Sequence, residues 1–309
     1  MVHFGVRLPQ NADEFPQASP SSILTIARLA EKLGYYSVWV HDHIISEHTI
    51  FDPLAVWGFL ASATDKIKLG SAGFQISLRH AVWLAREVSS LDVLSNGRLI
   101  VGLVPGRREK ECETAGVPLS EVGKRTDEGI KVMKTLWTQR NASFSGRFYK
   151  FSNVTMMPQP VQKPHPPLLI GGASSASTSR VVRLGDGWVP FSLDADQFRQ
   201  GVNDIWRKAK EKKRNTDAMM FSTENFVAIV SPETCSRDFA EEYLVRKFHS
   251  KERATKGTII GEPDEIIKMI EEYIAASANH FELRFIARDL KGVSASMELF
   301  ARTVAPSFT

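Results

Sequence analysis

The segment SILTIARLAEKLGYYSVWVHDH (residues 22–43) decides the fold class. Its first part has apolar residues at three- and four-residue spacing, which is the pattern of a helix with one buried face. Gly34 follows where a left-handed helix C-cap is favoured. Val38, Trp39 and Val40 then form an apolar run of strand character. The segment therefore predicts a helix that leads directly into a buried strand.

The same alternation of helix and strand continues on both sides of this segment. Two predicted helices start with a capping residue followed by proline, Ser19–Pro20 and Asp52–Pro53, which is typical of helix N-termini. Eight strands are predicted, at residues 3–8, 38–43, 66–74, 98–104, 166–172, 186–191, 221–230 and 280–286. Because strands that alternate with helices form parallel sheets, we expect a single α/β domain over residues 1–309, a TIM (β/α)₈ barrel. A doubly wound sheet is the alternative.

One stretch interrupts this alternation. Residues 141–167 hold five of the fifteen prolines and contain two short segments of strand character. A long connection of this kind inside a compact domain is usually a functional or surface segment. We expect an insertion at the barrel surface that contains two antiparallel strands.

Composition favours an unexported protein. The chain has no apolar run of membrane-spanning length and no signal-peptide pattern at Met1, so no membrane partner is expected. Its two cysteines, Cys112 and Cys235, are too few for a disulfide framework or a cysteine-based metal site. We therefore expect a cytoplasmic location and no metal.

The net charge of +4 comes largely from two local basic runs, at residues 208–214 and 245–256. Such runs are usually solvated helix faces, and neither accompanies a nucleic-acid-binding motif. Nucleic acid is therefore not an expected partner. Basic surface would also favour an anionic cofactor or substrate.

Three titratable residues follow the strand of the opening segment. His41, Asp42 and His43 stand where a (β/α)₈ barrel places its functional groups, at the C-terminal ends of the strands. We expect Val38 and Val40 to fill the barrel interior, with Trp39 packing toward the helices. Asp42 and His43 would then emerge at the rim.

The segment SLDVLSNGRLIVGLVPG (90–106) resembles the LDxLSxGRxxxGxGxG block of the bacterial luciferase-like flavin and deazaflavin oxidoreductases. Further matches follow the order of that family, at residues 27–43, 125–137, 158–172, 184–188 and 261–266. The resemblance implies a luciferase-like TIM barrel with an insertion and a flavin-like cofactor in its mouth. The DH pair at 42–43 and GVRLP at 5–9 resemble the branch that uses coenzyme F420, an 8-hydroxy-5-deazaflavin.

That branch implies an oxidoreductase that transfers a hydride between F420 and a small organic substrate, in a protein that forms homodimers. One alternative is an FMN-dependent monooxygenase of the same fold. A 5-deazaflavin has carbon in place of flavin N5 and reacts poorly with dioxygen, which confines it to hydride transfer. The other alternative is a non-catalytic paralogue that binds a cofactor or a partner.

The resemblance also implies catalytic roles for three residues. Asp42 and His43 would lie beside the cofactor ring, and Glu111 matches an acidic position of the family. A histidine with a pKa near neutrality can move a proton during hydride transfer. The alternatives are a hydrogen-bond network that only orders loops around His43 and a loop- or helix-capping role for Glu111.

Two small-residue segments are the expected cofactor contacts. Ala72 and Gly73 match a position where the family carries a non-prolyl cis peptide behind the ring, although small residues also permit close barrel packing. The glycine-rich turn matches the phosphate loop of the family, and backbone N–H groups at a helix N-terminus favour an anion. The alternative for this turn is a tight αβ connection. Its residues are Gly171, Gly172, Ala173 and Ser174.

The loop at residues 102–111 departs from the family pattern. Arg107 stands where glucose-6-phosphate-oxidising relatives carry an acid, which disfavours that substrate. Arg107 and Arg108 are candidates for holding an anionic substrate or the carboxylate tail of the cofactor, because guanidinium groups pair with carboxylates in a fork geometry. The alternative is that both are solvated loop charges.

Overall fold

The computed structural model describes residues 2–11, 18–254 and 256–308. Eight parallel strands form a closed barrel, because β10 pairs with β9 on one side and with β12 on the other, and β12 pairs with β1. The predicted (β/α)₈ barrel is confirmed, and the doubly wound alternative is wrong. The barrel strands are β1 (His3–Arg7), β2 (Ser37–Val40), β3 (Lys68–Ser71), β5 (Leu99–Val104), β8 (Leu168–Gly171), β9 (Gly187–Val189), β10 (Met220–Ile229) and β12 (His280–Phe285).

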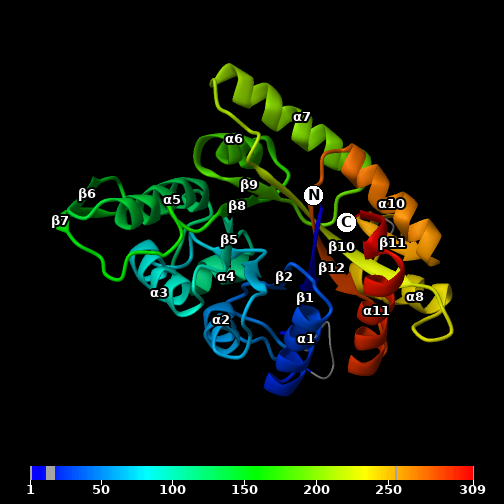
Figure 1. Cartoon of the computed structure of the whole chain (residues 1–309). Helices are drawn as coiled ribbons and strands as arrows, with labels where there is room; N and C mark the ends of the chain where they lie inside the picture. The colour runs from blue at the N-terminus through cyan, green and yellow to red at the C-terminus, as the bar shows by residue number, and fades with distance from the viewer. Residues whose placement is uncertain (1, 12–17, 255, 309) are drawn as a thin grey trace.

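Helices cover the outside of the barrel (Figure 1). Both predicted caps are present: Ser19 accepts a hydrogen bond from the backbone of Ser22, and Asp52 accepts from the backbone of Leu54. Gly34 has the left-handed φ of +81° that its position requires. The helices are α1 (Pro20–Lys32), α2 (Pro53–Ala61), α3 (Ala81–Leu94), α4 (Glu109–Thr114), α5 (Val122–Thr138), α6 (Ser175–Leu184), α7 (Ala195–Glu211), α8 (Arg237–Phe248), α9 (Lys251–Ala254), α10 (Pro263–Ala275), α11 (Leu290–Thr303) and the 3₁₀ turn η1 (Ala305–Phe308).

Trp39 faces the barrel interior, so the expected orientation of the second strand is wrong. Its indole packs with Ile100, Leu169 and Val189, whereas Val38 and Val40 belong to the layer between the barrel and the helices. Glycines on both neighbouring strands make room for the ring. A Cβ atom would lie 2.5 Å from the Trp39 side chain if added at Gly5, and 2.6 Å from it if added at Gly70. With the strand in this orientation, His41 continues the inward face and Asp42 the outward face.

The predicted third strand is interrupted. β3 ends at Ser71, and the chain resumes pairing as β4 (Phe74–Gln75), which joins β5. The break lies at Gly73, where a Cβ would come within 2.5 Å of the carbonyl carbon of Gly102. The expected cis peptide at Ala72–Gly73 is absent, since the cis bonds of the described residues are Met157–Pro158 and Lys163–Pro164. Two small residues pressed against Gly102 make the bend instead.

Two elements complete the fold. The predicted insertion is confirmed as an antiparallel pair, β6 (Ala142–Ser145) and β7 (Lys150–Val154), outside the barrel (Figure 1). Strand β11 (Thr258–Gly261) was not predicted, and it pairs with the second half of β10. Among the described residues, no helix combines the length and the apolar character needed to cross a bilayer.

Candidate active site

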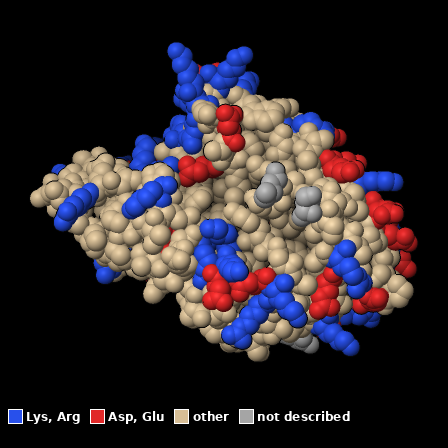
Figure 2. Space-filling view, viewed as in Figure 1, with Lys and Arg blue, Asp and Glu red and all other residues tan. Residues whose placement is uncertain are grey.

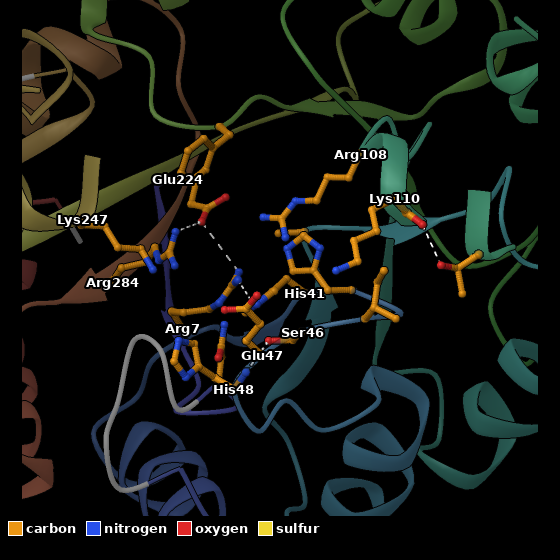
Figure 3. A pocket seen from close by; sticks show the side chains of 16 residues that line it. Arg7, His41, Ser46, Glu47, His48, Arg108, Lys110, Glu224, Lys247 and Arg284 are labelled. Atoms are coloured by element: carbon orange, nitrogen blue, oxygen red, sulfur yellow. Dashed lines mark hydrogen bonds and ion pairs between the residues drawn. The ribbon is translucent and has the colours of Figure 1, made fainter. Parts of the chain in front are cut away.

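A cavity of about 900 Å³ opens at the C-terminal ends of the strands. Five basic and two acidic side chains line it, together with three histidines and Phe191 (Figure 3). Its volume lies in the upper part of the range of about 300–1,000 Å³ that is usual for small-molecule sites. Because basic side chains outnumber acidic ones in its lining, the cavity favours a negatively charged ligand.

Charged side chains that face the interior of the barrel from β1, β10 and β12 form the floor of the cavity. Arg7 on β1 donates to Glu282 at 2.6 Å, and Arg284 on β12 donates to Glu224 on β10 at 2.8 Å. Arg7 also contacts Nδ1 of His41. Burial, reinforced by the nearby charge of Glu224, raises the pKa of Glu282 to about 8 in spite of its arginine partners. The floor is therefore a buried network of two arginines and two glutamates.

His43 lies at this mouth in contact with Glu111 of α4. Nδ1 of His43 is 3.2 Å from Oε1 of Glu111, and the same oxygen accepts a hydrogen bond from the backbone N–H of Ile44 at 3.1 Å. Burial lowers the pKa of His43, and the charge of Arg108 lowers it further, against the opposing effects of Glu111 and Asp42. The imidazole is thus biased toward its neutral form, which can accept a proton.

Asp42 points away from the cavity, as its position on the outward face of β2 requires. Its carboxylate accepts two hydrogen bonds from Arg79, at 2.6 and 2.7 Å, and one from the backbone of Gln75 at 3.0 Å. Arg79 in turn donates to Asp52 at 2.6 Å. Asp42 therefore fixes the loop that carries His43 and does not reach the cavity lining.

The expected cofactor contacts are only partly brought together. Ala72 lines the cavity beside His41 and His43. The turn at 171–174 follows β8 at the same end of the barrel, but its residues are not among those that line the cavity. Gly172 has a left-handed φ of +94°, and the Ser174 hydroxyl caps α6 by accepting from the backbone of Ser177. Gly171 is buried in β8, whereas residues 172–174 are solvent-exposed at the N-terminus of α6.

The loop after β5 carries three exposed cations that differ in their relation to the cavity. Arg107, Arg108 and Lys110 are all exposed, but only Arg108 and Lys110 line the cavity. Sequence reasoning missed Lys110, and it also missed Arg7 and Arg284. Both of these arginines follow the two-residue alternation of a strand, which is the signal that identifies them. The described residues contain no group of His, Cys, Asp or Glu side chains suited to a metal ion.

A polar cavity with a histidine–glutamate pair at the C-terminal face of the barrel lies where enzymes of the (β/α)₈ class place their active sites. The family model of the luciferase-like monooxygenases matches residues 2–258. The chain therefore belongs to the luciferase-like monooxygenase family.

Relatives in this family use two kinds of cofactor. The chain is 30% identical over 190 residues to the FMNH₂-dependent dimethylsulfone monooxygenase of Pseudomonas putida. The aligned region covers 60% of this chain and 51% of that protein. It is 25% identical over 302 residues to the F420-dependent glucose-6-phosphate dehydrogenase of Amycolatopsis mediterranei, which covers 85% and 88%. These relatives are oxidoreductases that depend on F420 or flavin.

A solved structure shares the fold over the whole chain. The F420-dependent secondary alcohol dehydrogenase in complex with an F420–acetone adduct matches with a TM-score of 0.86 at 19% identity, covering 100% of this chain and 99% of that chain. At this level of identity the match shows the fold alone.

Proposed function

We propose that this protein is an oxidoreductase that transfers a hydride between coenzyme F420 and a small organic substrate. The observation that carries the proposal is the pair of His43 and Glu111 at the cavity. Nδ1 of His43 is held by Glu111, which leaves Nε2 as the ring atom available to a substrate oxygen. The neutral imidazole accepts the proton of an alcohol as its carbon is oxidised, and it returns a proton in the reverse direction.

The residues present fit an F420-type cofactor. The cavity is large enough for a ring system, its lining is cationic, and Oε2 of Glu111 is buried without a partner among the described residues. When bound, the deazaflavin supplies the carbon that gives or accepts the hydride. Ala72 and Gly73 would lie beside the ring, and Arg107 would meet the carboxylate tail at the rim. The 171–174 turn would hold the phosphate.

An FMN-dependent monooxygenase is the second candidate. The similarity to the dimethylsulfone monooxygenase supports it, because the identity of 30% exceeds the 25% found for the F420-dependent relative. Fluorescence titration of the purified protein with F420 and with FMN separates the two. We expect F420 to bind more tightly. Tight binding of FMN without a response to F420 would refute the first candidate, and binding of neither would favour a non-catalytic paralogue.

Replacement of the histidine tests its catalytic role. We expect His43→Ala to lower turnover far more than it lowers cofactor affinity, because the imidazole acts on the proton and the cofactor has other contacts. His48→Ala is the matched control, since His48 lines the same cavity from the same loop. Equal effects of the two substitutions on turnover would contradict the role.

The assembly and surroundings of the protein are part of the proposal. A homodimer through α2 and α3 would cover the exposed apolar side chains of Phe59, Trp83 and Leu94, which are 41%, 64% and 71% exposed. Both cysteines are free and buried, which supports a reducing, cytoplasmic location.

The ion pairs around the basic run at residues 208–214 support the interpretation of this run as a solvated helix surface and not as a nucleic-acid site. Figure 2 shows its Lys and Arg atoms gathered at the top of the view. Lys208 pairs with Asp204 at 2.6 Å, and Arg207 pairs with both Asp204 and Glu211. The run is thus partly compensated by acids of its own helix.

A further inference from the structure

The cationic residues of the cavity lie on two opposite walls. Arg284 and Lys247 lie on one wall with Glu224, and Arg108 and Lys110 lie on the other (Figure 3). The first wall belongs to β10, β12 and α8, and the second belongs to the loop after β5 and the start of α4. The two walls therefore come from opposite sides of the barrel.

The charge is balanced differently on the two walls. On the first wall Arg284 donates to Glu224 at 2.8 Å, and on the floor Arg7 donates to Glu282 at 2.6 Å. On the second wall, neither Arg108 nor Lys110 forms an ion pair with a carboxylate in the part of the chain that the structure describes. Among the described residues, Arg108 and Lys110 therefore bring positive charge to the cavity that no carboxylate neutralises in a direct ion pair.

These two side chains share the cavity with His43, the residue proposed to move the proton. Arg108 is near enough for its charge to lower the pKa of His43, and all three residues line the cavity. A ligand anion held there would lie beside the reacting atoms. The phosphate of a flavin-type cofactor is separated from its ring by a five-carbon ribityl chain, so a cofactor whose ring lies at His43 places its phosphate elsewhere. An anion held at this wall would therefore belong to the substrate.

From these observations we infer that Arg108 and Lys110 form a substrate-anion subsite, which selects small organic substrates that carry a carboxylate, sulfonate or phosphate group next to the reacting carbon. The inference rests on the proposed function only for the position of the reacting atoms at His43. The subsite itself rests on the two cations and the cavity that they line. Charge-assisted contacts to such groups are about twice as strong as neutral hydrogen bonds.

The chain offers a matched control for this subsite. Arg107 is adjacent to Arg108 and has the same charge, but it lies outside the cavity lining. Arg108→Ala and Arg107→Ala change the net charge of the protein equally. A difference between them therefore reports contact within the cavity and not long-range attraction.

The test uses two pairs of probes of nearly equal size, methanesulfonate with dimethylsulfone and acetate with acetamide. Their affinities are measured by calorimetry at low ionic strength, with the protein alone and with the protein saturated with F420. We expect each anion to bind about tenfold more tightly than its neutral partner. Arg108→Ala and Lys110→Ala should abolish this preference, Arg107→Ala should retain it, and added salt should weaken it.

Three results would overturn the inference: no preference for the anions, equal loss in the Arg107 and Arg108 variants, or a fall in F420 affinity in Arg108→Ala while anion binding persists. The last result would assign the cations to the cofactor tail. Failure of the protein to bind either F420 or FMN would refute the proposed function separately, because the titrations of the protein alone still report on the subsite.

Discussion

Oε1 of Glu111 lies 3.2 Å from Nδ1 of His43, while Oε2 of the same carboxylate is buried without a partner among the described residues. A buried carboxylate oxygen without a hydrogen bond is costly, so it is retained only where the fold over-determines it or where a function needs it. From its position behind a cavity-lining imidazole, Glu111 raises the pKa of His43 and so opposes the lowering by burial and by Arg108.

Glu111→Gln tests this relationship. The amide oxygen can still accept from Ile44, so the fold is retained, but the negative charge that raises the pKa of His43 is lost. The pKa of His43 then falls, and the step that needs protonated His43 declines at a lower pH than in the wild type. The pH dependence of turnover in the reducing direction measures this. An unchanged profile would show that Glu111 only caps the loop.

Asp42→Ala is expected to lower the free energy of unfolding by about 3 kcal/mol, because it leaves the largely buried Arg79 without its main partner. Asp52→Ala removes the exposed partner and a helix cap, and about 1 kcal/mol is expected for it. Urea unfolding followed by tryptophan fluorescence gives both values. Similar losses of unfolding free energy in the two variants would show that the buried Asp42–Arg79 pair contributes no more to stability than the exposed Asp52 contacts.

Glu282→Gln is expected to change how stability depends on pH. The pKa of Glu282 is about 8 in the folded protein and about 4.5 when unfolded, so the folded protein binds more protons between these values. The resulting stabilisation is fully present below pH 4.5 and is lost as the pH rises toward 8. The glutamine of the variant does not titrate, so the variant does not lose this stabilisation as the pH rises. The free energy of unfolding of the variant minus that of the wild type should therefore increase from pH 5.5 to pH 8.5. A constant difference in urea unfolding would contradict the shifted pKa.

Ala173→Asp tests the phosphate role of the glycine-rich turn. Ala173 lies outside the left-handed region that Gly172 occupies, so the substitution adds a negative charge without backbone strain. Repulsion of a cofactor phosphate should weaken F420 affinity at least tenfold in a fluorescence titration. Ser179→Asp adds the same charge further along α6 and should have a much smaller effect. Equal affinities of the two variants would exclude the turn as the phosphate site.

Trp83→Glu tests the dimer surface. Trp83 is 64% exposed on α3, so a charge there should dissociate a dimer that buries this face without unfolding the barrel. Sedimentation velocity gives the oligomeric state. Trp206→Glu is the control, because Trp206 is 41% exposed on α7, on a different helix. Retention of a dimer by Trp83→Glu would place the interface elsewhere.

Local signals were enough to predict the barrel. The caps at Ser19 and Asp52, the glycine at Gly34 and the regular spacing of strands all depend on residues close together in sequence. The orientation of the second strand was predicted wrongly, because alternation shows that two faces differ and not which face is inside. Here the space left by Gly5 and Gly70 decides that Trp39 points inward.

The site was only partly predictable for a similar reason. His43 and Glu111 were identified through the family resemblance, and the structure brings them together. The partnership of Asp42 with Arg79 depends on how neighbouring strands lie side by side, and that of Arg7 with a glutamate 275 residues away depends on closure of the barrel. No local pattern encodes such pairs. That Arg108 lines the cavity and Arg107 does not likewise depends on how the loop leaves β5.

The closure of the barrel also joins β9 to β10 through a short ladder. β9 and β10 share only two registered ladder pairs, at Met220 and Phe221, before β10 turns to β11 as its neighbour. Beyond this seam a single isolated bridge joins Phe191 to Glu224, and both residues line the cavity. Few backbone pairs therefore hold the barrel wall beside Phe191 and Glu224, so the shape of the cavity on this side depends on side-chain packing more than on a continuous strand ladder.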